Sequence, residues 1–513
     1  MPSRPHRLRA LPFLVGALCT IFLAACGNGD PDAKPASIVP AAAPLYFEVT
    51  VRPEGDVRAD AEAAARKIFG KEEPAAELRR LIDRALADEQ VSFEEDIEPW
   101  LGRRIGFVAT NFTEEQAEFA LIAAVEDTDE AIDSIVAARG REAEDEPELQ
   151  EREYNGTDYL FDAEDGTGLA EVGDFVVLAS EPLLGQLIDA EEDGEVLSEN
   201  ERFSRAREAV GEESLGFGYL NAQALLDIVG QAGGLPPQGL APLRQLVGES
   251  IALSLTAQES AVALDVVSFG TQPQPGADPR AVADSLRGLP AGSLVGLGLG
   301  DVGDQLQAQL TASGLGPNIL GQVERATGLD VEEDLLSWMG QGSAFVQGSG
   351  IGDLGGALIV QTDDRRATLD ALEKIEPLLE AQDATVEQVD EDGLGGLKAE
   401  FEGLPLPVYL VVAGERFLVA IGDAALDSAV QPRGTLGEDP GFAQATGVLG
   451  EGMQPAFYAS VPGLVGLAES LGLAQDPSFR QARRYLDAFT VLVGGSARDG
   501  EVSRYRLALG LAP

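Results

Sequence analysis

The feature that most constrains the fold of this chain is an internal repeat. The segments FEEDIEPWLGRRIGFVA (93–109) and VEEDLLSWMGQGSAFVQ (331–347) contain the only two tryptophans of the sequence, Trp100 and Trp338. Aligned without gaps, both segments carry Glu-Glu-Asp before the tryptophan, a glycine two residues after it and then a Phe-Val pair. Self-similarity at such a long period indicates two copies of one folding unit.

The similarity continues downstream in both halves. The tripeptide Ala-Leu-Ile occurs at 120–122 and again at 357–359, and each copy is followed by a Thr-Asp pair that can cap a helix. The spacing between matched residues changes by only a few positions, as small loop insertions would produce. A stretch rich in proline and glycine, 271–279, separates the halves. We therefore predict one unit at 41–275 and a second at 288–513.

Both halves have the same predicted order of elements. The order is a strand (45–51), a helix (61–68), the tryptophan segment, two strands (105–110 and 119–125), an amphipathic helix, short strands joined by Asp-Gly turns, further helices and a closing hairpin. In the amphipathic helix Ile132, Ile135 and Val136 share one face. In the copy the corresponding residues are Leu369, Leu372, Ile375 and Leu379. Hairpin-linked strands with helices between them indicate an α+β fold, an antiparallel sheet with helices packed on one face, used twice.

The first thirty residues have the composition of an export signal. Arg4, Arg7 and Arg9 precede an apolar run at 11–25 that is too short to span a bilayer. The run ends in Leu-Ala-Ala-Cys (23–26), which resembles the bacterial lipobox, in which the cysteine becomes the lipidated N-terminus. We predict a signal peptide at 1–25, lipid on Cys26 and a flexible tether at 26–40. The protein would then be held on the extracytoplasmic face of the cell membrane. A plain secretory signal or a short buried helix is the alternative.

Processing at Cys26 would leave a mature chain with no histidine and no free thiol. His6 is the only histidine, and it would leave with the signal together with Cys19. A mature chain without histidine or free thiol excludes Ser-His-Asp and Cys-His catalysis, Cys/His zinc sites and disulfides. Gly298–Gly303 fits the pattern G-x-G-x-x-G, but 60 glycines make a chance match common. We expect no cofactor and no metal.

The charge of the chain restricts its partners. The sequence has 87 Asp and Glu residues and 36 Lys and Arg residues, which gives a formal net charge of −51. Loss of the signal peptide would also remove three arginines. Such a field repels the phosphates of nucleic acids and anionic lipid headgroups. We therefore expect no nucleic-acid partner, and a membrane contact made through lipid on Cys26.

The paired tryptophans allow two interpretations. The acidic run before each can cap a short helix, and Gly102 and Gly340 can end it. Trp100 and Trp338 would then be buried structural anchors. Alternatively, an exposed indole with acids nearby would suit the stacking of a sugar or aromatic ligand.

Several motifs are similar to those of one bacterial family. They are the Leu-Ala-Ala-Cys start, APLYFEVTVRP (43–53) and EDIEPWLG (95–102). The chain resembles the uncharacterised lipoprotein family called domain of unknown function 3352, common in actinobacteria, over nearly its whole mature length. The second copy departs from the motif, with Ser337 where the first has Pro99. The resemblance implies an envelope lipoprotein and supplies no catalytic residues.

The sequence favours a function in binding or scaffolding at the cell envelope, with an envelope protein or a small molecule as the unidentified partner. Two alternatives stay open: a hydrolase that uses paired carboxylates, and a carrier of lipid or another hydrophobe. Enzymatic activity is left undecided, with a non-enzymatic role favoured. No residue is assigned as catalytic.

Overall fold

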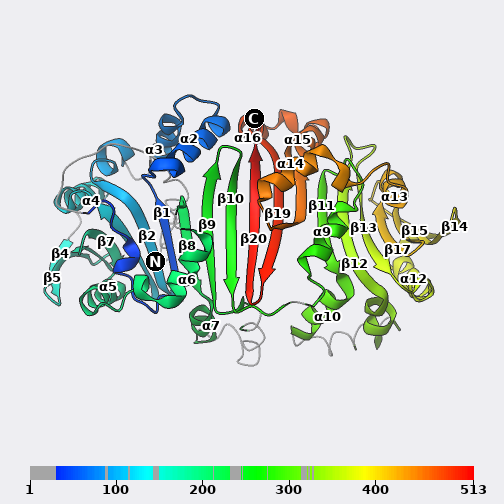
Figure 1. Cartoon of the computed structure of the whole chain (residues 1–513), viewed down its shortest axis with the longest axis horizontal. Helices are drawn as coiled ribbons and strands as arrows, with labels where there is room; N and C mark the ends of the chain where they lie inside the picture. The colour runs from blue at the N-terminus through cyan, green and yellow to red at the C-terminus, as the bar shows by residue number, and fades with distance from the viewer. Residues whose placement is uncertain are drawn as a thin grey trace, which may run out of the picture. The chain divides into compact units, whose positions relative to one another are not determined.

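The computed structural model describes residues 30–86, 91–113, 116–142, 149–211, 213–231, 244, 247–273, 275–312, 321, 324–325 and 328–513 (Figure 1). The chain divides into two compact units. Unit 1 is formed by the described residues of Met1–Leu240, Val247–Glu259 and Leu264–Gly270; unit 2 is formed by those of Ala241–Leu246, Ser260–Ala263 and Thr271–Pro513. Within the described ranges, no helix is both long enough and apolar enough to cross a membrane. The predicted signal peptide and Cys26 lie outside the described residues.

Unit 1 is built around antiparallel strands. They are β1 (Leu45–Thr50), β2 (Leu101–Thr113), β3 (Gln116–Val125), β4 (Leu149–Tyr154), β5 (Thr157–Asp162), β6 (Thr167–Val172), β7 (Phe175–Ser180), β8 (Gly216–Asn221), β9 (Ser250–Gln258) and β10 (Ala261–Phe269), most of which belongs to this unit. The helices are α2 (Gly55–Phe69), α3 (Pro74–Leu86), α4 (Thr128–Glu142), α5 (Glu181–Asp193), α6 (Glu201–Val210) and α7 (Ala222–Gln231), with the short turns η1 (Pro35–Ser37), η3 (Phe93–Ile97) and η4 (Leu197–Glu199).

Unit 2 repeats this inventory with small differences. Its strands are β11 (Val295–Asp301), β12 (Met339–Gln347), β13 (Gly355–Thr362), β14 (Ala384–Glu391), β15 (Leu394–Phe401), β16 (Val408–Ala413), β17 (Arg416–Ile421), β18 (Gln454–Ser460), β19 (Phe489–Asp499) and β20 (Val502–Leu511). Its helices are α9 (Pro279–Arg287), α10 (Val302–Ala312), α12 (Arg365–Glu380), α13 (Asp423–Val430), α14 (Pro440–Leu449), α15 (Val461–Ser470) and α16 (Pro477–Leu486), with the short turns η5 (Val331–Leu335), η6 (Leu336–Trp338), η7 (Leu436–Glu438) and η8 (Leu473–Gln475).

The strands of the two units are joined in the same order. In unit 1 the order is β4-β5-β6-β7-β3-β2-β1-β8-β9-β10. In unit 2 it is β14-β15-β16-β17-β13-β12-β11-β18-β19-β20. The neighbouring strands from β4 to β9 and from β14 to β20 in these orders are antiparallel. The predicted α+β class with an antiparallel sheet is confirmed, and each strand of unit 1 has a counterpart in unit 2.

Helices cover both faces of the sheet, so the expectation of one covered face is wrong. On β17, Phe417 and Val419 pack into a core with Trp338, while Leu418 packs into a different core with Phe442 of α14. Neighbouring residues of a strand point to opposite faces, which puts one core on each side of the sheet. The sequence hides this arrangement because β17 (RFLVAI) is apolar on both faces and shows no alternation.

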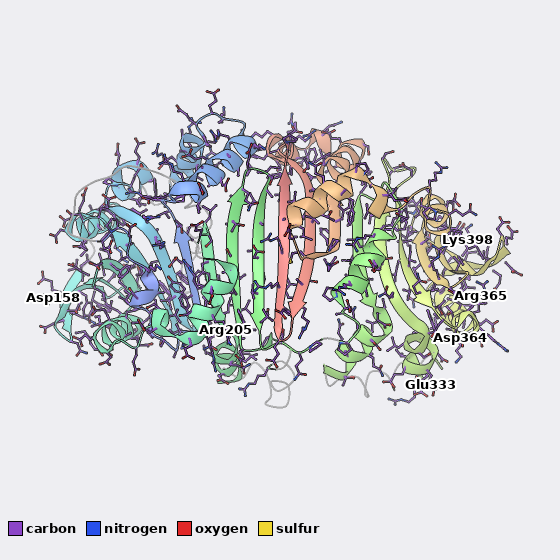
Figure 2. All side chains as sticks on the ribbon, in the orientation of Figure 1. Asp158, Arg205, Glu333, Asp364, Arg365 and Lys398 are labelled. Carbon is purple, nitrogen blue, oxygen red and sulfur yellow. The ribbon has the colours of Figure 1, made fainter. Side chains whose placement is uncertain are left out.

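The predicted amphipathic helix is confirmed in both units as α4 and α12. Its predicted apolar residues in α4 pack against a core that contains Trp100, and those in α12 pack against a core that contains Trp338. The helix α12 begins after Asp364, labelled in Figure 2, whose carboxylate accepts hydrogen bonds from the backbone N–H groups of Arg366 and Ala367 at 3.0 and 2.9 Å. These bonds satisfy two N–H groups that a helix N-terminus otherwise leaves without partners.

A bulge of different length shifts the two sequences against each other. Between Leu101 and Ile105, β2 advances four residues while its partner β3 advances two. Between Met339 and Gly342, β12 advances three residues while β13 advances two. The gapless sequence alignment therefore holds up to the residue after each tryptophan and fails beyond the bulge.

The pairing of the two Phe-Val motifs is wrong by one residue as a result. Val108 pairs with Ala120 and Phe345 with Ala357, so Val108 and Phe345 take equivalent places. They are 0% and 3% exposed, whereas Val346 is 38% exposed. The Thr-Asp pairs are also misaligned, since Thr128 begins α4 and Thr362 ends β13.

The last part of the predicted tether is folded. Residues Pro35–Ser37 form η1, and Ala36, Ile38 and Val39 are 3%, 2% and 0% exposed. The backbone N–H of Leu197 donates to the carbonyl of Val39 at 2.7 Å, which ties this segment to unit 1. The chain from Pro35 onward is part of the unit, so a flexible spacer that extends to Pro40 is wrong.

Candidate functional site

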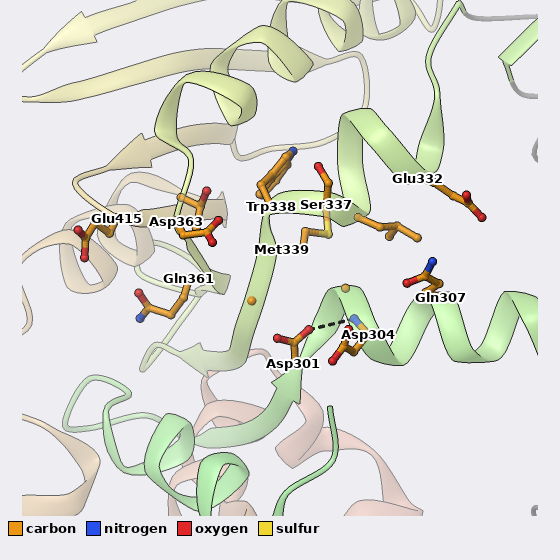
Figure 3. Close-up of a pocket in the computed structure, with 14 residues that line it drawn as sticks. Asp301, Asp304, Gln307, Glu332, Ser337, Trp338, Met339, Gln361, Asp363 and Glu415 are labelled. Carbon is orange, nitrogen blue, oxygen red and sulfur yellow. Dashed lines mark hydrogen bonds between the residues drawn. The ribbon is translucent and has the colours of Figure 1, made fainter. Parts of the chain in front are cut away.

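Unit 2 contains an acidic groove of about 680 Å³ beside Trp338 (Figure 3). Its walls come from the end of β11, the first turns of α10, the η5–η6 segment, the start of β12, the end of β13 and the β16–β17 turn. The lining residues are Asp301, Gly303, Asp304, Gln307, Glu332, Leu336, Ser337, Trp338, Met339, Gly340, Gln361, Thr362, Asp363 and Glu415. We call this feature the acidic groove.

Among the residues that the structure describes, five carboxylates and no basic side chain line the acidic groove. The carboxylates are Asp301, Asp304, Glu332, Asp363 and Glu415, each on a different element or turn except the first two, which flank the start of α10. None of the five forms an ion pair within the described part of the chain. Five negative charges around one concave surface favour a positively charged occupant.

The start of α10 forms one wall of the groove and depends on a glycine. Asp301 accepts a hydrogen bond from the backbone N–H of Asp304 at 2.9 Å, the contact drawn in Figure 3, and so caps the helix. A Cβ atom on Gly303 would lie 2.6 Å from the carbonyl oxygen of Leu336 and 2.5 Å from that of Met339. Only glycine allows α10 to approach the tryptophan segment this closely.

Both tryptophans are buried, with their indole nitrogens bonded to backbone. Trp100 and Trp338 are 6% and 3% exposed, and each Nε1–H donates to a carbonyl four residues earlier, Asp96 at 2.6 Å and Asp334 at 2.7 Å. Trp338 also packs edge-on against Phe417, with ring centroids 5.3 Å apart. At this burial neither indole offers an open ring face for stacking, although Trp338 is among the residues that line the groove. This geometry matches the structural-anchor interpretation.

The acidic run before each tryptophan is predicted to cap a short helix, but other residues provide the cap. The helical turns η3 and η5 are capped by the residues that precede the run, Ser92 and Asp330. The last acid of each run, Asp96 or Asp334, accepts instead from the backbone N–H of its cap residue, at 2.8 and 2.9 Å. The turn is closed from both ends, in the manner of a capping box.

Gly102 and Gly340 do not end a helix, so that prediction is wrong. They lie in β2 and β12. A Cβ atom on Gly102 would lie 2.7 Å from the carbonyl oxygen of Ala124 on the neighbouring strand. At Gly102 the glycine is required by the close approach of two strands at the bulge.

Lys374 of α12 fixes the carboxylate beside Trp338. Its Nζ lies 2.6 Å from Oδ2 of Asp334, and this hydrogen bond lowers the pKa of Asp334 below its ordinary value. Asp334 is thus compensated by a cation, although it lies outside the groove lining. The five groove carboxylates have no such partner in the described residues.

In unit 1 an arginine occupies the place beside Trp100 that corresponds to the acidic groove beside Trp338. We call this place the corner of each unit. Arg52, between β1 and α2, forms an ion pair through Nη1 with the carboxylate of Glu126. Its Nη2 donates to the carbonyl oxygen of Glu98 at 2.6 Å. The side chains of Arg52 and Glu126 are 11% and 7% exposed, so the pair is removed from solvent.

The N-terminal segment covers the same region of unit 1. The backbone N–H of Arg103 donates to the carbonyl of Pro31 at 2.9 Å, and the Arg103 guanidinium lies 2.8 Å from the carboxylate of Asp32. A Cβ atom on Gly102 would lie 3.0 Å from Cα of Pro31. The place that is open beside Trp338 is therefore occupied beside Trp100.

Comparison with known proteins gives a family and no activity. Residues 10–511 match the family described as protein of unknown function, DUF3352. The chain belongs to this family. No match was found among curated proteins. These comparisons therefore assign no catalytic residue and no ligand to this chain.

Among solved structures, two crystal forms of TP0453 are similar to this DUF3352 chain. Form IV has a TM-score of 0.25 and 13% identity, covering 46% of this chain and 81% of that chain. Form I has a TM-score of 0.25 and 12% identity, covering 46% and 79%. A TM-score of 0.25 is too low to support an argument about fold or function.

The acidic groove of this DUF3352 chain was not predicted from its sequence. Its five carboxylates come from four separate stretches of chain, and only Glu332 stands within the repeated tryptophan motif. One signal was available: residues 51–54 (VRPE) separate β1 from α2, whereas α10 follows β11 directly. That difference in length is what gives unit 1 its Arg52 and leaves unit 2 without a counterpart.

Proposed function

We propose that the chain is a lipid-anchored, extracytoplasmic envelope protein that binds a cationic ligand in the acidic groove. The observation that carries this proposal is the contrast between the two units. In unit 1 Arg52 pairs with Glu126, whereas in unit 2 five carboxylates and no cation are found among the described residues that line the groove. A binding partner would supply the missing positive charge.

The electrostatics favour a cation over other ligand classes. Opposite unit charges about 4 Å apart attract by about 1 kcal/mol in bulk water and about 4 kcal/mol near a protein surface. The formal net charge of −51 adds a long-range field that attracts cations and repels anions. An acyl chain would have to desolvate the groove carboxylates, which is costly, so the lipid-carrier alternative finds no support here.

We also propose that the two units descend from one ancestral unit by duplication. The identical strand order and the equivalent tryptophan contacts, Trp100 to Asp96 and Trp338 to Asp334, support this origin. After duplication, the corner in unit 1 was closed by Arg52 and the corner in unit 2 was left open. Lipid on Cys26 would hold both units near the membrane surface, while the acidic surface keeps them from anionic headgroups.

Calorimetric titration of the mature lipidated protein with spermidine at low ionic strength tests this function. We expect binding at one site that weakens about ten-fold in the double variant Asp363→Asn/Glu415→Gln, because two carboxylates of the groove are lost. The control variant Asp392→Asn/Glu402→Gln removes the same charge from exposed turns of unit 2 and should bind as the parent does. Equal loss in both variants would contradict a defined site. Mass spectrometry of the same preparation should find diacylglyceryl on Cys26; an unmodified thiol would contradict the anchor.

A further inference from the structure

We infer that the group bound in the acidic groove is a guanidinium, carried by an arginine side chain in a peptide or by a free alkylguanidinium. The inference rests on the proposed function and names the chemistry of its ligand. Its basis is that unit 1 holds a guanidinium, that of Arg52, at the equivalent corner.

The equivalence of the two corners follows from strand register. Leu101 pairs with Val125 on the adjacent strand, and Met339 pairs with Thr362. The residue after each tryptophan thus pairs with the last residue of the next strand in both units. The residue that follows that strand is therefore equivalent in the two units, before any bulge intervenes.

These equivalent residues carry the contacts of the Arg52 guanidinium. Its ion-pair partner Glu126 corresponds to Asp363, a carboxylate in both units. Its carbonyl partner Glu98 precedes Trp100 by two residues, the place that Leu336 takes before Trp338. Both Asp363 and Leu336 line the acidic groove. Unit 2 thus keeps the carboxylate that holds the arginine in unit 1.

Among the described residues of unit 2, none takes the place of Arg52. Strand β11 ends at Asp301 and α10 begins at Val302, so the loop that carries Arg52 is missing. Instead of an internal arginine, unit 2 adds further carboxylates around the opening, including Asp301 and Glu415. Unit 2 therefore keeps a carboxylate acceptor, Asp363, at the place equivalent to Glu126.

A guanidinium suits this groove better than an ammonium. It is planar, donates in two parallel directions and is more weakly hydrated, so it can reach carboxylates on different elements at a lower desolvation cost. Trp338 and Met339 are also among the lining residues, and their apolar side chains suit the apolar stem of the guanidinium. A carboxylate next to the guanidinium, as in free arginine, would be repelled by the five acids of the lining.

Titration with matched tripeptides tests the inference. The probes are Gly-Arg-Gly and Gly-Lys-Gly, both acetylated and amidated, measured on the mature protein by calorimetry. We expect the arginine peptide to bind about ten-fold more tightly than the lysine peptide, and Asp363→Asn to weaken it about ten-fold. The matched control Asp392→Asn, at an exposed turn, should leave its affinity unchanged.

Titrations with further ligands show whether the guanidinium comes from a peptide or from a free molecule. They also separate the guanidinium preference from cation binding in general. Propylguanidinium binding as tightly as the arginine peptide indicates a free alkylguanidinium, and weaker binding indicates a peptide; both support the inference. Free arginine should bind more weakly than either. Equal affinity for the arginine and lysine peptides, with both weakened by Asp363→Asn, would overturn the guanidinium preference and leave the cation-binding function standing. Absence of binding by these peptides and by spermidine would overturn both.

Discussion

Replacing Arg52 with alanine is expected to lower the free energy of unfolding by about 3–5 kcal/mol. The guanidinium pairs with a carboxylate in a place where both side chains are nearly excluded from solvent, 11% and 7% exposed. Removing it leaves the charge of Glu126 buried without this partner, which costs far more than the loss of an exposed ion pair. Equilibrium denaturation with urea, followed by far-ultraviolet circular dichroism, measures the change.

Two further variants make the Arg52 result specific. Arg58→Ala breaks an exposed pair with Glu62, whose side chains are 40% and 41% exposed, and should change stability by less than about 0.5 kcal/mol. The loss of stability in Arg52→Lys should lie between those of Arg58→Ala and Arg52→Ala. An ammonium keeps the charge but cannot contact Glu126 and the Glu98 carbonyl in two directions as the guanidinium does. If Arg52→Ala proved as stable as Arg58→Ala, the closed corner of unit 1 would not depend on its arginine.

Replacing Trp338 with alanine is expected to destabilise unit 2 by about 3–5 kcal/mol. The indole is 3% exposed, donates to the carbonyl of Asp334 and packs edge-on against Phe417. Trp338→Phe keeps an aromatic ring in the core but loses the hydrogen bond, so it should cost less. Trp100→Ala, at the equivalent place in unit 1, should behave like Trp338→Ala. Urea denaturation of the three variants measures these differences.

The same variants decide between the two interpretations of the tryptophans. A structural anchor predicts a large stability loss in Trp338→Ala and in Trp100→Ala. A stacking platform predicts that Trp338→Ala folds with parental stability and fails to bind the ligand. Parental stability of Trp338→Ala would therefore contradict the anchor role that its burial indicates.

The sequence was informative where the residues of an element lie close together along the chain. The repeated tryptophan segment, the apolar face of α12 and the Asp392-Gly393 turn between β14 and β15 all carry local patterns. In that turn Glu391 pairs with Leu394, and the two central residues have φ of 53° and 81°, as a tight hairpin requires. Such features follow from periodicity and turn chemistry alone.

The sequence was misleading where a single inserted residue changes the register. The extra bulged residue in β2 moves Val108, rather than Phe107, into the place of Phe345. A gapless alignment of two Phe-Val pairs cannot detect this shift, because both pairs are apolar and adjacent. One residue of slip exchanges the buried and exposed faces of a strand, which is why the consequence for packing is large.

The candidate site depended on long-range placement and could not be read from the sequence. Asp301 ends β11 and Asp363 follows β13, far apart in the chain, and the contact of Arg52 with Glu126 spans 74 residues. Acidic residues are so frequent in this chain that none of them is distinguished by type. Only the comparison of two equivalent corners, one with an arginine and one without, singles out Asp363.

A crystal structure of the mature protein grown with propylguanidinium tests the central claim most directly. The predicted result is a planar guanidinium within hydrogen-bond distance, about 3 Å, of the Asp363 carboxylate, beside an unchanged Trp338. A guanidinium bound elsewhere on unit 2, with the acidic groove holding only solvent, would contradict the claim that unit 2 keeps open the site that Arg52 closes in unit 1.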